Sequence, residues 1–295
     1  MARRDFKAMT RSLKRCERYL GYRRPNEAGE IRTDPQHPPS SLPEHPVIFV
    51  SVDFEADETN QRITEMGITS LDTELLLGVE PGVDGIGWMN LAYSHHYLIA
   101  GTDNMLGDYT KRGKFSKSNP GGFIKGKTQE RTLDEMRKIV REHFEGPFSS
   151  NGVRTAVRNR RELVLVAHGR TNEFKYFEQL DFDPRKHPKV IDIIDTQDLE
   201  EALRRDPTRG TAHSQPRRLE RIIEETLGGE QRGKHNGGMD AFYTMQALLG
   251  LTFRSIQGRV AGSEDEEWGT NDDGGQGVVP RKSTHEYMDY YAKLQ

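Results

Sequence analysis

The most constraining feature of the sequence is an apolar run, Val47–Ala56, that carries Asp53 and Glu55 near its end. A run of this length, bounded by polar residues, predicts a buried β-strand. Side chains two positions apart in a strand share one face, so the two carboxylates are expected side by side. Paired carboxylates repel each other and are costly to remove from water, and a divalent cation would relieve that cost. The alternative is a strand that has simply ended, with both acids in water.

The composition limits the class of protein. The chain has 295 residues, enough for a sizeable core, with 33% hydrophobic residues, 30% charged residues and a net charge of -3. No segment approaches the roughly 18 apolar residues of a membrane helix, and no secretory signal is visible. The single cysteine, Cys16, excludes an internal disulfide and all-cysteine zinc sites. We therefore expect a soluble protein of the cytoplasm or the nucleus, with no membrane partner.

Periodic apolar patterns predict an α/β fold. The expected strands lie at 47–56, 62–72, 95–100, 162–168 and 190–194. The expected helices lie at 132–144, 172–180, 196–205, 219–227 and 239–249, the first with Thr132 as its N-cap. A hairpin-like run of strands followed by strand–helix alternation predicts a mixed five-stranded sheet flanked by helices.

Shifts in composition divide the chain into three parts. Residues 1–45 combine a basic, partly amphipathic helix over 3–24 with a Pro-rich linker, and this helix is expected to present a solvated face or a surface for a protein partner. Residues 46–257 hold the predicted domain. Residues 258–295 form an acidic, Gly-rich tail that is predicted to be disordered apart from a short terminal helix.

Further acids follow the predicted strands or open the predicted helices. Glu173 comes just after the strand at 162–168, and Asp240 lies in the first turn of the helix that follows His235-Asn236-Gly237-Gly238. A structural explanation exists for both, because the helix dipole favours acids in a first turn. The chemical alternative is a two-metal nuclease site, in which cations about 4 Å apart need carboxylates from several elements.

That chemistry assigns a role to each residue type. Mg2+ and Mn2+ prefer oxygen ligands, so the four carboxylates would hold two such ions. His235 would take a proton from the attacking water, since the pKa of histidine is ordinarily about 6.5. The candidate catalytic residues are Asp53, Glu55, Glu173, His235 and Asp240, and all but the histidine are candidate metal ligands.

A basic segment at 109–128 contains no acid but includes aromatic residues. Basic side chains suit phosphates and aromatic rings suit bases, so the segment is typical of an arm that binds nucleic acid. The alternative is a solvated surface loop. The candidate nucleic-acid-binding residues are Lys111, Arg112, Lys114, Lys117, Lys125 and Lys127.

Two of these motifs resemble those of a known superfamily. Val50–Glu55, followed by the strand around 63–68, resembles the first motif of the DEDD exonucleases. His235 and Asp240, with four residues between them, are similar to the third motif of their DEDDh branch, which has a ribonuclease-H-like fold. Residues 123–128 and 235–244 are similar to a fungal branch that includes an Argonaute-interacting exonuclease of RNA quelling. The resemblance covers roughly residues 46–252.

The resemblance implies a metal-dependent 3′→5′ exonuclease that releases nucleoside monophosphates from RNA or single-stranded DNA, with RNA favoured. It makes Asp53, Glu55 and Asp240 metal ligands and His235 the general base. The family usually has Asp where this chain has Glu173, and a misplacement of about 1 Å can cost about 100-fold in rate.

This departure leaves a second hypothesis, a catalytically impaired module that binds nucleic acid or protein on the same fold. Asp181 and Asp183 are alternative ligands, about two helical turns beyond Glu173.

Overall fold

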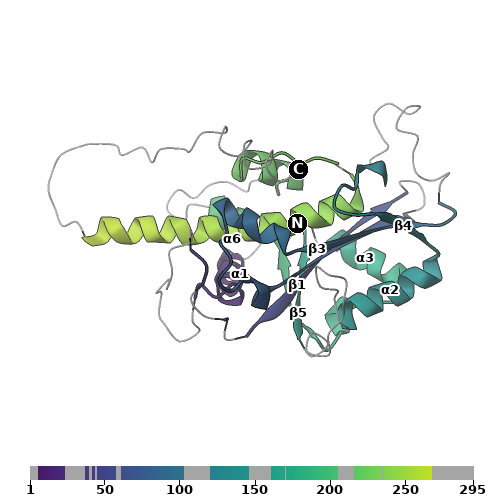
Figure 1. The fold of residues 1–295 in the computed structure, drawn as a ribbon, viewed down its shortest axis with the longest axis horizontal. Helices are drawn as coiled ribbons and strands as arrows, with labels where there is room; N and C mark the ends of the chain where they lie inside the picture. The colour runs from purple at the N-terminus through teal and green to yellow at the C-terminus, as the bar shows by residue number, and fades with distance from the viewer. Residues whose placement is uncertain are drawn as a thin grey trace.

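A mixed sheet of six strands forms the centre of the fold, with helices on both faces (Figure 1). The computed structural model describes residues 6–23, 37–39, 42–43, 45–57, 61–102, 120–145, 161–169, 171–204, 216–233 and 235–267. The strands lie in the order β4-β3-β2-β1-β5-β6. Their bounds are β1 Val47–Ala56, β2 Ile63–Asp72, β3 Tyr93–Ile99, β4 Thr128–Arg131, β5 Glu162–Ala167 and β6 Val190–Asp195.

The strand pairing confirms the predicted α/β class and mixed sheet. β1, β2 and β3 pair antiparallel, whereas β5 and β6 continue the sheet in parallel on the other side of β1. The predicted number of strands, five, is wrong, because β4 adds a sixth strand parallel to β3 at the edge. The four residues of β4 are exposed or half-buried, so they carry no apolar signal from which a strand could be predicted.

The predicted helices are present, with some different ends. Their bounds are α1 Phe6–Tyr19, α2 Leu133–Glu145, α3 Thr171–Gln179, α4 Thr196–Arg204, α5 Leu219–Arg221, which runs into a π-helical turn at Ile222–Thr226, and α6 Gly237–Glu267. Thr132 caps α2 as predicted: its hydroxyl accepts a hydrogen bond from the Glu135 N–H at 3.3 Å, and its own N–H donates to the Glu135 carboxylate at 2.7 Å. Short 3-10 turns lie at Thr73–Leu76, Val83–Asn90, Pro120–Gly122 and Pro184–Lys186.

Alternate residues of β1 enter two separate hydrophobic cores. Phe49 belongs to the core that β1 shares with α1, α4 and α6. Ile48 and Val50 belong to the core on the opposite face, which α2 and α3 cover. Because successive side chains of a strand point to opposite faces, Asp53 and Glu55 lie on the same face as Phe49, which is the face of α6.

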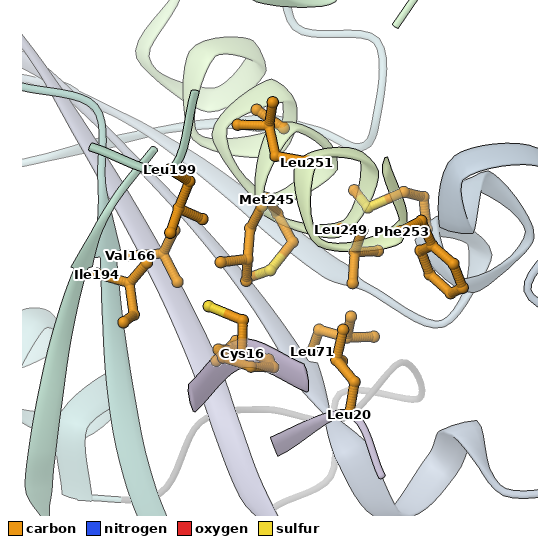
Figure 2. Packing of buried hydrophobic residues seen from close by; sticks show 14 of the residues in the cluster. Cys16, Leu20, Leu71, Val166, Ile194, Leu199, Met245, Leu249, Leu251 and Phe253 are labelled. Atoms are coloured by element: carbon orange, nitrogen blue, oxygen red, sulfur yellow. The ribbon is translucent and has the colours of Figure 1, made fainter. Parts of the chain in front are cut away.

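The N-terminal helix α1 packs into the first of these cores. Figure 2 shows Cys16 of α1, and Leu20 just after the helix ends, facing Met245 and Leu249 of α6. The carboxylate of Glu17 is buried with them and accepts a hydrogen bond from the Ser255 hydroxyl at 3.1 Å. α1 is therefore joined to the sheet domain by buried contacts, while the division of the chain at residues 45 and 257 stays a prediction.

Several predictions fall outside the described residues. They concern most of the linker before residue 46, the part of the basic segment at 109–119 with Lys111, Arg112, Lys114 and Lys117, and the tail from residue 268 onward. α6 itself continues to Glu267, beyond the helix end predicted at 249. Among the helices that the structure describes, none is long and apolar enough to cross a membrane.

Candidate active site

The candidate site begins at the end of β1, where the first two acids lie beside β2. Asp53 is paired with Gly67, and Glu55 is paired with Glu65. Both acids of β1 are half-buried, whereas Glu65 is fully buried. Three carboxylates thus share one face at this end of the sheet, two of them directly opposite each other across the antiparallel pair.

Glycines bring the start of α6 against these strands. A Cβ atom at Gly67 would lie 1.9 Å from the carbonyl oxygen of Gly237, so the helix could not approach β2 at this point if position 67 had a side chain. The Ser51 hydroxyl of β1 donates to the carbonyl oxygen of Ala241 at 2.7 Å. The two contacts fix the first turn of α6, and with it Asp240, over the end of β1.

The helix start also has its own cap, Asn236. The Asn236 side-chain oxygen accepts a hydrogen bond from the Met239 N–H at 3.0 Å. Just before it, His235 is exposed and adopts a φ of 60°, a left-handed conformation that few residues other than glycine take. This conformation turns the chain immediately before α6 begins.

A buried hydrogen bond between a histidine and a carboxyl group lies behind the helix start. The fully buried His96 and Glu65 are joined through His96 Nε2 and Glu65 Oε2 at 2.9 Å. The same carboxylate oxygen accepts a long hydrogen bond from the Gly237 N–H at 3.4 Å, and the Asn236 amide nitrogen lies 3.3 Å from His96 Nε2. Glu65 therefore ties β2, β3 and α6 together beneath the site.

The predicted residues from three segments converge here. Potential ligand atoms of Glu55, His235 and Asp240 all lie within 4.8 Å of one another. Burial raises the pKa of Asp240 to about 7, although a hydrogen bond from the Gln231 amide opposes the shift. Burial also raises the pKa of Asp53 well above its usual value, and the negative charges of Glu173 and Asp240 add to that shift.

Glu173 joins the cluster from the first turn of α3. Its side chain is 7% exposed, and its Oε2 atom has no hydrogen-bond partner among the described residues. Burial raises the pKa of Glu173 to about 8, with contributions from the charges of Asp195 and Asp240, while a backbone hydrogen bond from Phe54 opposes the shift. The longer side chain thus brings its carboxylate into electrostatic contact with the other acids.

Besides Glu65, two further neighbours of the site were not predicted. Asp195, at the end of β6, accepts hydrogen bonds from the N–H groups of Gly169 and Gln197 at 3.1 Å and 3.0 Å. Tyr176, one turn after Glu173 on α3, has a pKa raised by burial and by the charges of Glu173, Glu55 and Asp53. The sequence did hold a signal for Asp195. This residue ends a parallel strand, and this strand end lies at the same edge of the sheet as the end of β5.

The alternative ligands lie in other interactions. Asp181 forms an ion pair with Arg137 at 2.8 Å, and Asp183 forms one with Arg185 at 2.7 Å. Of the predicted nucleic-acid-binding residues, Lys125 and Lys127 lie on the exposed segment before β4. The Lys125 ammonium lies 4.4 Å from the ring centroid of Phe242, two residues after Asp240.

The donor set suits a hard divalent cation. Several carboxylates converge, and no lysine or arginine among the described residues offsets the charges of Asp53, Glu173 and Asp240. A buried carboxylate oxygen without a partner, such as Glu173 Oε2, is costly unless a proton or a cation is bound. Mg2+ and Mn2+ prefer such all-oxygen surroundings, so the residues present fit a metal of this kind.

A known family model matches most of the chain. Residues 48–251 match a DEDDh family model described as DNA polymerase III subunit epsilon-like, C-terminal domain. No curated protein matches the sequence. A solved structure of the nuclease domain of 3′hExo, described as a DEDDh family member and bound to rAMP, aligns with a TM-score of 0.42 and 15% identity, covering 73% of this chain and 94% of that chain.

Proposed function

The chain belongs to the DEDDh nuclease family, and on that premise we propose that it is a 3′→5′ exonuclease of single-stranded nucleic acid, with RNA favoured. Family membership implies a metal-dependent nuclease with a nucleic-acid substrate. The direction of digestion, the preference for RNA and the use of two cations are the further steps of the proposal. The observation that supports the proposal is the convergence of Glu173 with Asp53 and Asp240. Burial and mutual repulsion keep these acids partly protonated, and a bound cation would give such a cluster a purpose.

Each side chain has a role in the proposal. Asp53, Glu55, Glu173 and Asp240 hold two Mg2+ or Mn2+ ions. When bound, such ions stabilise the developing charge of the phosphodiester and provide a nucleophile at neutral pH. His235 accepts the proton of the attacking water, and its exposed position beside Glu55 and Asp240 suits a residue that must reach both solvent and substrate.

The burial of Glu173 favours an active enzyme over the impaired binding module. If the extra methylene had removed this residue from the site, its carboxylate would gain water or an ion-pair partner. Instead it is buried among other acids, without a partner for Oε2 among the residues described. The chain therefore retains a carboxyl group inside the site at the position where the family usually has Asp.

Digestion of end-labelled RNA tests the proposal. With Mn2+, single-stranded RNA labelled at its 5′ end should yield progressively shorter labelled fragments together with unlabelled nucleoside monophosphates. Asp53→Asn should slow the reaction at least about 100-fold, because one metal ligand is lost. Asp134→Asn is the matched control, since Asp134 is an exposed acid of α2 on the opposite face of the sheet.

Two results would overturn the proposal. Release of the labelled 5′ nucleotide first would contradict the direction of digestion. Absence of cleavage with either ion, or equal cleavage by the wild type and Asp53→Asn, would exclude the assigned active site.

A further inference from the structure

A row of positive charge runs along the exposed face of α1. Lys7, Arg11, Lys14 and Arg18 follow one another by four, three and four residues, and all four side chains are exposed. This spacing places them on one face of the helix. We call these four residues the basic stripe. The opposite face of α1, with Met9, Leu13 and Cys16, is buried in the core, so the orientation of the stripe is fixed by packing.

Other charges of α1 are used within the fold. Glu17, the only acid of the helix, is buried and forms an ion pair with Arg23 at 2.7 Å. Arg15 forms an ion pair with Asp192 of β6 at 2.6 Å. By contrast, no described residue forms an ion pair or hydrogen bond with the side chains of Arg11, Lys14 and Arg18.

The stripe works against the stability of the helix. Like charges three or four residues apart repel one another on a helix surface. Lys7 also lies in the first turn of α1, where the helix dipole disfavours cations. Only Arg18, in the last turn, is favoured by the helix dipole. Helix stability therefore does not explain the row as a whole, and its arrangement suits an external anion.

The character of the stripe favours a nucleic acid over a protein. Protein interfaces are anchored by aromatic and aliphatic side chains, and among the side chains described on α1, from Lys7 onward, no large hydrophobic one is exposed. A phosphate backbone needs only a track of positive charge. α1 packs beside α6 on the face of the sheet that carries Asp53 and Glu55 (Figure 1).

We propose that the basic stripe binds the sugar–phosphate backbone of the substrate strand outside the active site, an inference that rests on the proposed nuclease function. α1 meets α6 at Ser255. Ser255 comes fifteen residues after Asp240, about 22 Å along a helix that rises 1.5 Å per residue. A strand must extend well beyond its cleaved end to reach α1, so the stripe acts on long strands and leaves dinucleotides unaffected.

Salt-dependent binding tests the inference. The stripe variant is Arg11→Gln/Lys14→Gln/Arg18→Gln, and the matched control is Lys138→Gln/Arg141→Gln/Lys186→Gln, which removes the same charge from α2 and the loop before β6. Fluorescence anisotropy measures the affinity for a long, labelled poly(U) strand over a range of salt concentrations, without divalent cations. Thermal unfolding checks that both variants are folded.

The stripe variant should bind long poly(U) more weakly than the control. Its plot of log affinity against log salt should be shallower by about 2, because each lost phosphate contact on a single strand contributes about 0.7 to the slope. With Mn2+, its KM for the long strand should rise, while its rate of dinucleotide hydrolysis equals that of the wild type.

Two results would overturn the inference. The first is an equal affinity and an equal slope for the stripe and control variants. The second is unchanged poly(U) binding with selective loss of binding to a polyglutamate probe, which would indicate an acidic protein partner. Dinucleotide hydrolysis by the wild type reports separately on the active site: if it fails, the proposed function fails, whatever the slopes show.

Discussion

At the scale of single residues, the proposed chemistry depends most on Glu173. The sequence indicates a departure from the family at this position, because an acid with an extra methylene stands where the family usually has Asp. In the fold, that longer side chain is buried near Asp53 and Asp240. Burial raises the pKa of all three carboxyl groups, and the charge of Asp240 adds to the shifts of Asp53 and Glu173. The site is therefore expected to be matched to the length of Glu.

We predict that shortening this side chain weakens the enzyme. Glu173→Asp should lower kcat about 100-fold, because it withdraws the carboxylate by about 1 Å, and Glu173→Gln should lower it further by removing the charge. Single-turnover hydrolysis of RNA with Mn2+ measures both effects. Glu178→Asp makes the same change on an exposed position of α3 and should leave the rate unaltered. A Glu173→Asp variant as fast as the wild type would contradict this view of the site.

We also predict an unusual pH dependence of stability without metal. The folded pKa values, about 8 for Glu173 and about 7 for Asp240, lie above the ordinary values of 4.5 and 3.8. Between the ordinary and the folded values, the folded state binds more protons than the unfolded state, so these groups stabilise the fold less as pH rises. Chemical unfolding in EDTA should show this fall from about pH 5 to pH 8, and Glu173→Gln/Asp240→Asn should flatten it. If the free energy of unfolding of the wild type instead rose with pH relative to that of the double variant, the raised pKa values of Glu173 and Asp240 would be refuted.

The spacing of residues within one segment was enough to predict most of the candidate site. Asp53 and Glu55 share a strand face, and His235 precedes Asp240 at a helix start. Each of these two relations lies within one short segment of the chain. Tyr176 and Glu65 were missed because their places depend on how separate elements meet. The sequence alone does not set the register that puts Glu65 opposite Glu55, nor the approach of α3 to β1.

At the scale of elements, the contact between β2 and α6 sets the geometry of the site. We predict that Gly67→Ala displaces the start of α6, since the new Cβ would overlap the carbonyl of Gly237, and that it lowers the free energy of unfolding by about 1–3 kcal/mol. Activity should fall more than stability, because His235 and Asp240 move with the helix start. Gly258→Ala, in an open part of α6, should instead be stabilising by about 0.5–1 kcal/mol. Equal effects of the two substitutions in unfolding and activity assays would contradict this account.

Elements with a strong apolar pattern were predicted well, and the others were not. β1 and β5 are apolar runs, α2 has apolar residues at helical spacing, and the observed bounds of all three are close to those predicted. β4 has none, because it is a short edge strand held by pairing with β3. α6 extends past its predicted end: Leu249, Phe253 and Ile256 follow one another by four and three residues, a helical spacing that the prediction of an end at 249 overlooked.

At the scale of the whole molecule, α1 is part of the folded domain. Because Leu13 is buried in the shared core, we predict that Leu13→Ala lowers the free energy of unfolding by about 2–5 kcal/mol. Lys14→Ala, on the exposed face of the same helix, should change it by less than about 0.5 kcal/mol. Denaturant unfolding of the full chain measures both values. A single transition that Leu13→Ala leaves unshifted would show that α1 is separate from the domain.

The sequence predicted the class of fold but not how its parts join. The mixed sheet followed from the chain order of strands and helices, whereas the order of its strands was not predicted. The packing of α1 against the domain was not predicted, because the buried face of α1 contacts α4 and α6, which are distant in the sequence. The likeness to the fungal branch, the nuclear or cytoplasmic location and the RNA preference stay predictions.

The most direct test of the central claim is a calorimetric titration of Mn2+ into the wild type and Asp240→Asn. If the converging acids form a metal centre, the wild type should bind two ions and release protons on binding, because cations displace protons from Glu173 and Asp240. Asp240→Asn should lose at least one of these ions. An absence of Mn2+ binding by the wild type, or identical titrations of the two proteins, would contradict the assignment of these carboxylates to a metal-dependent active site.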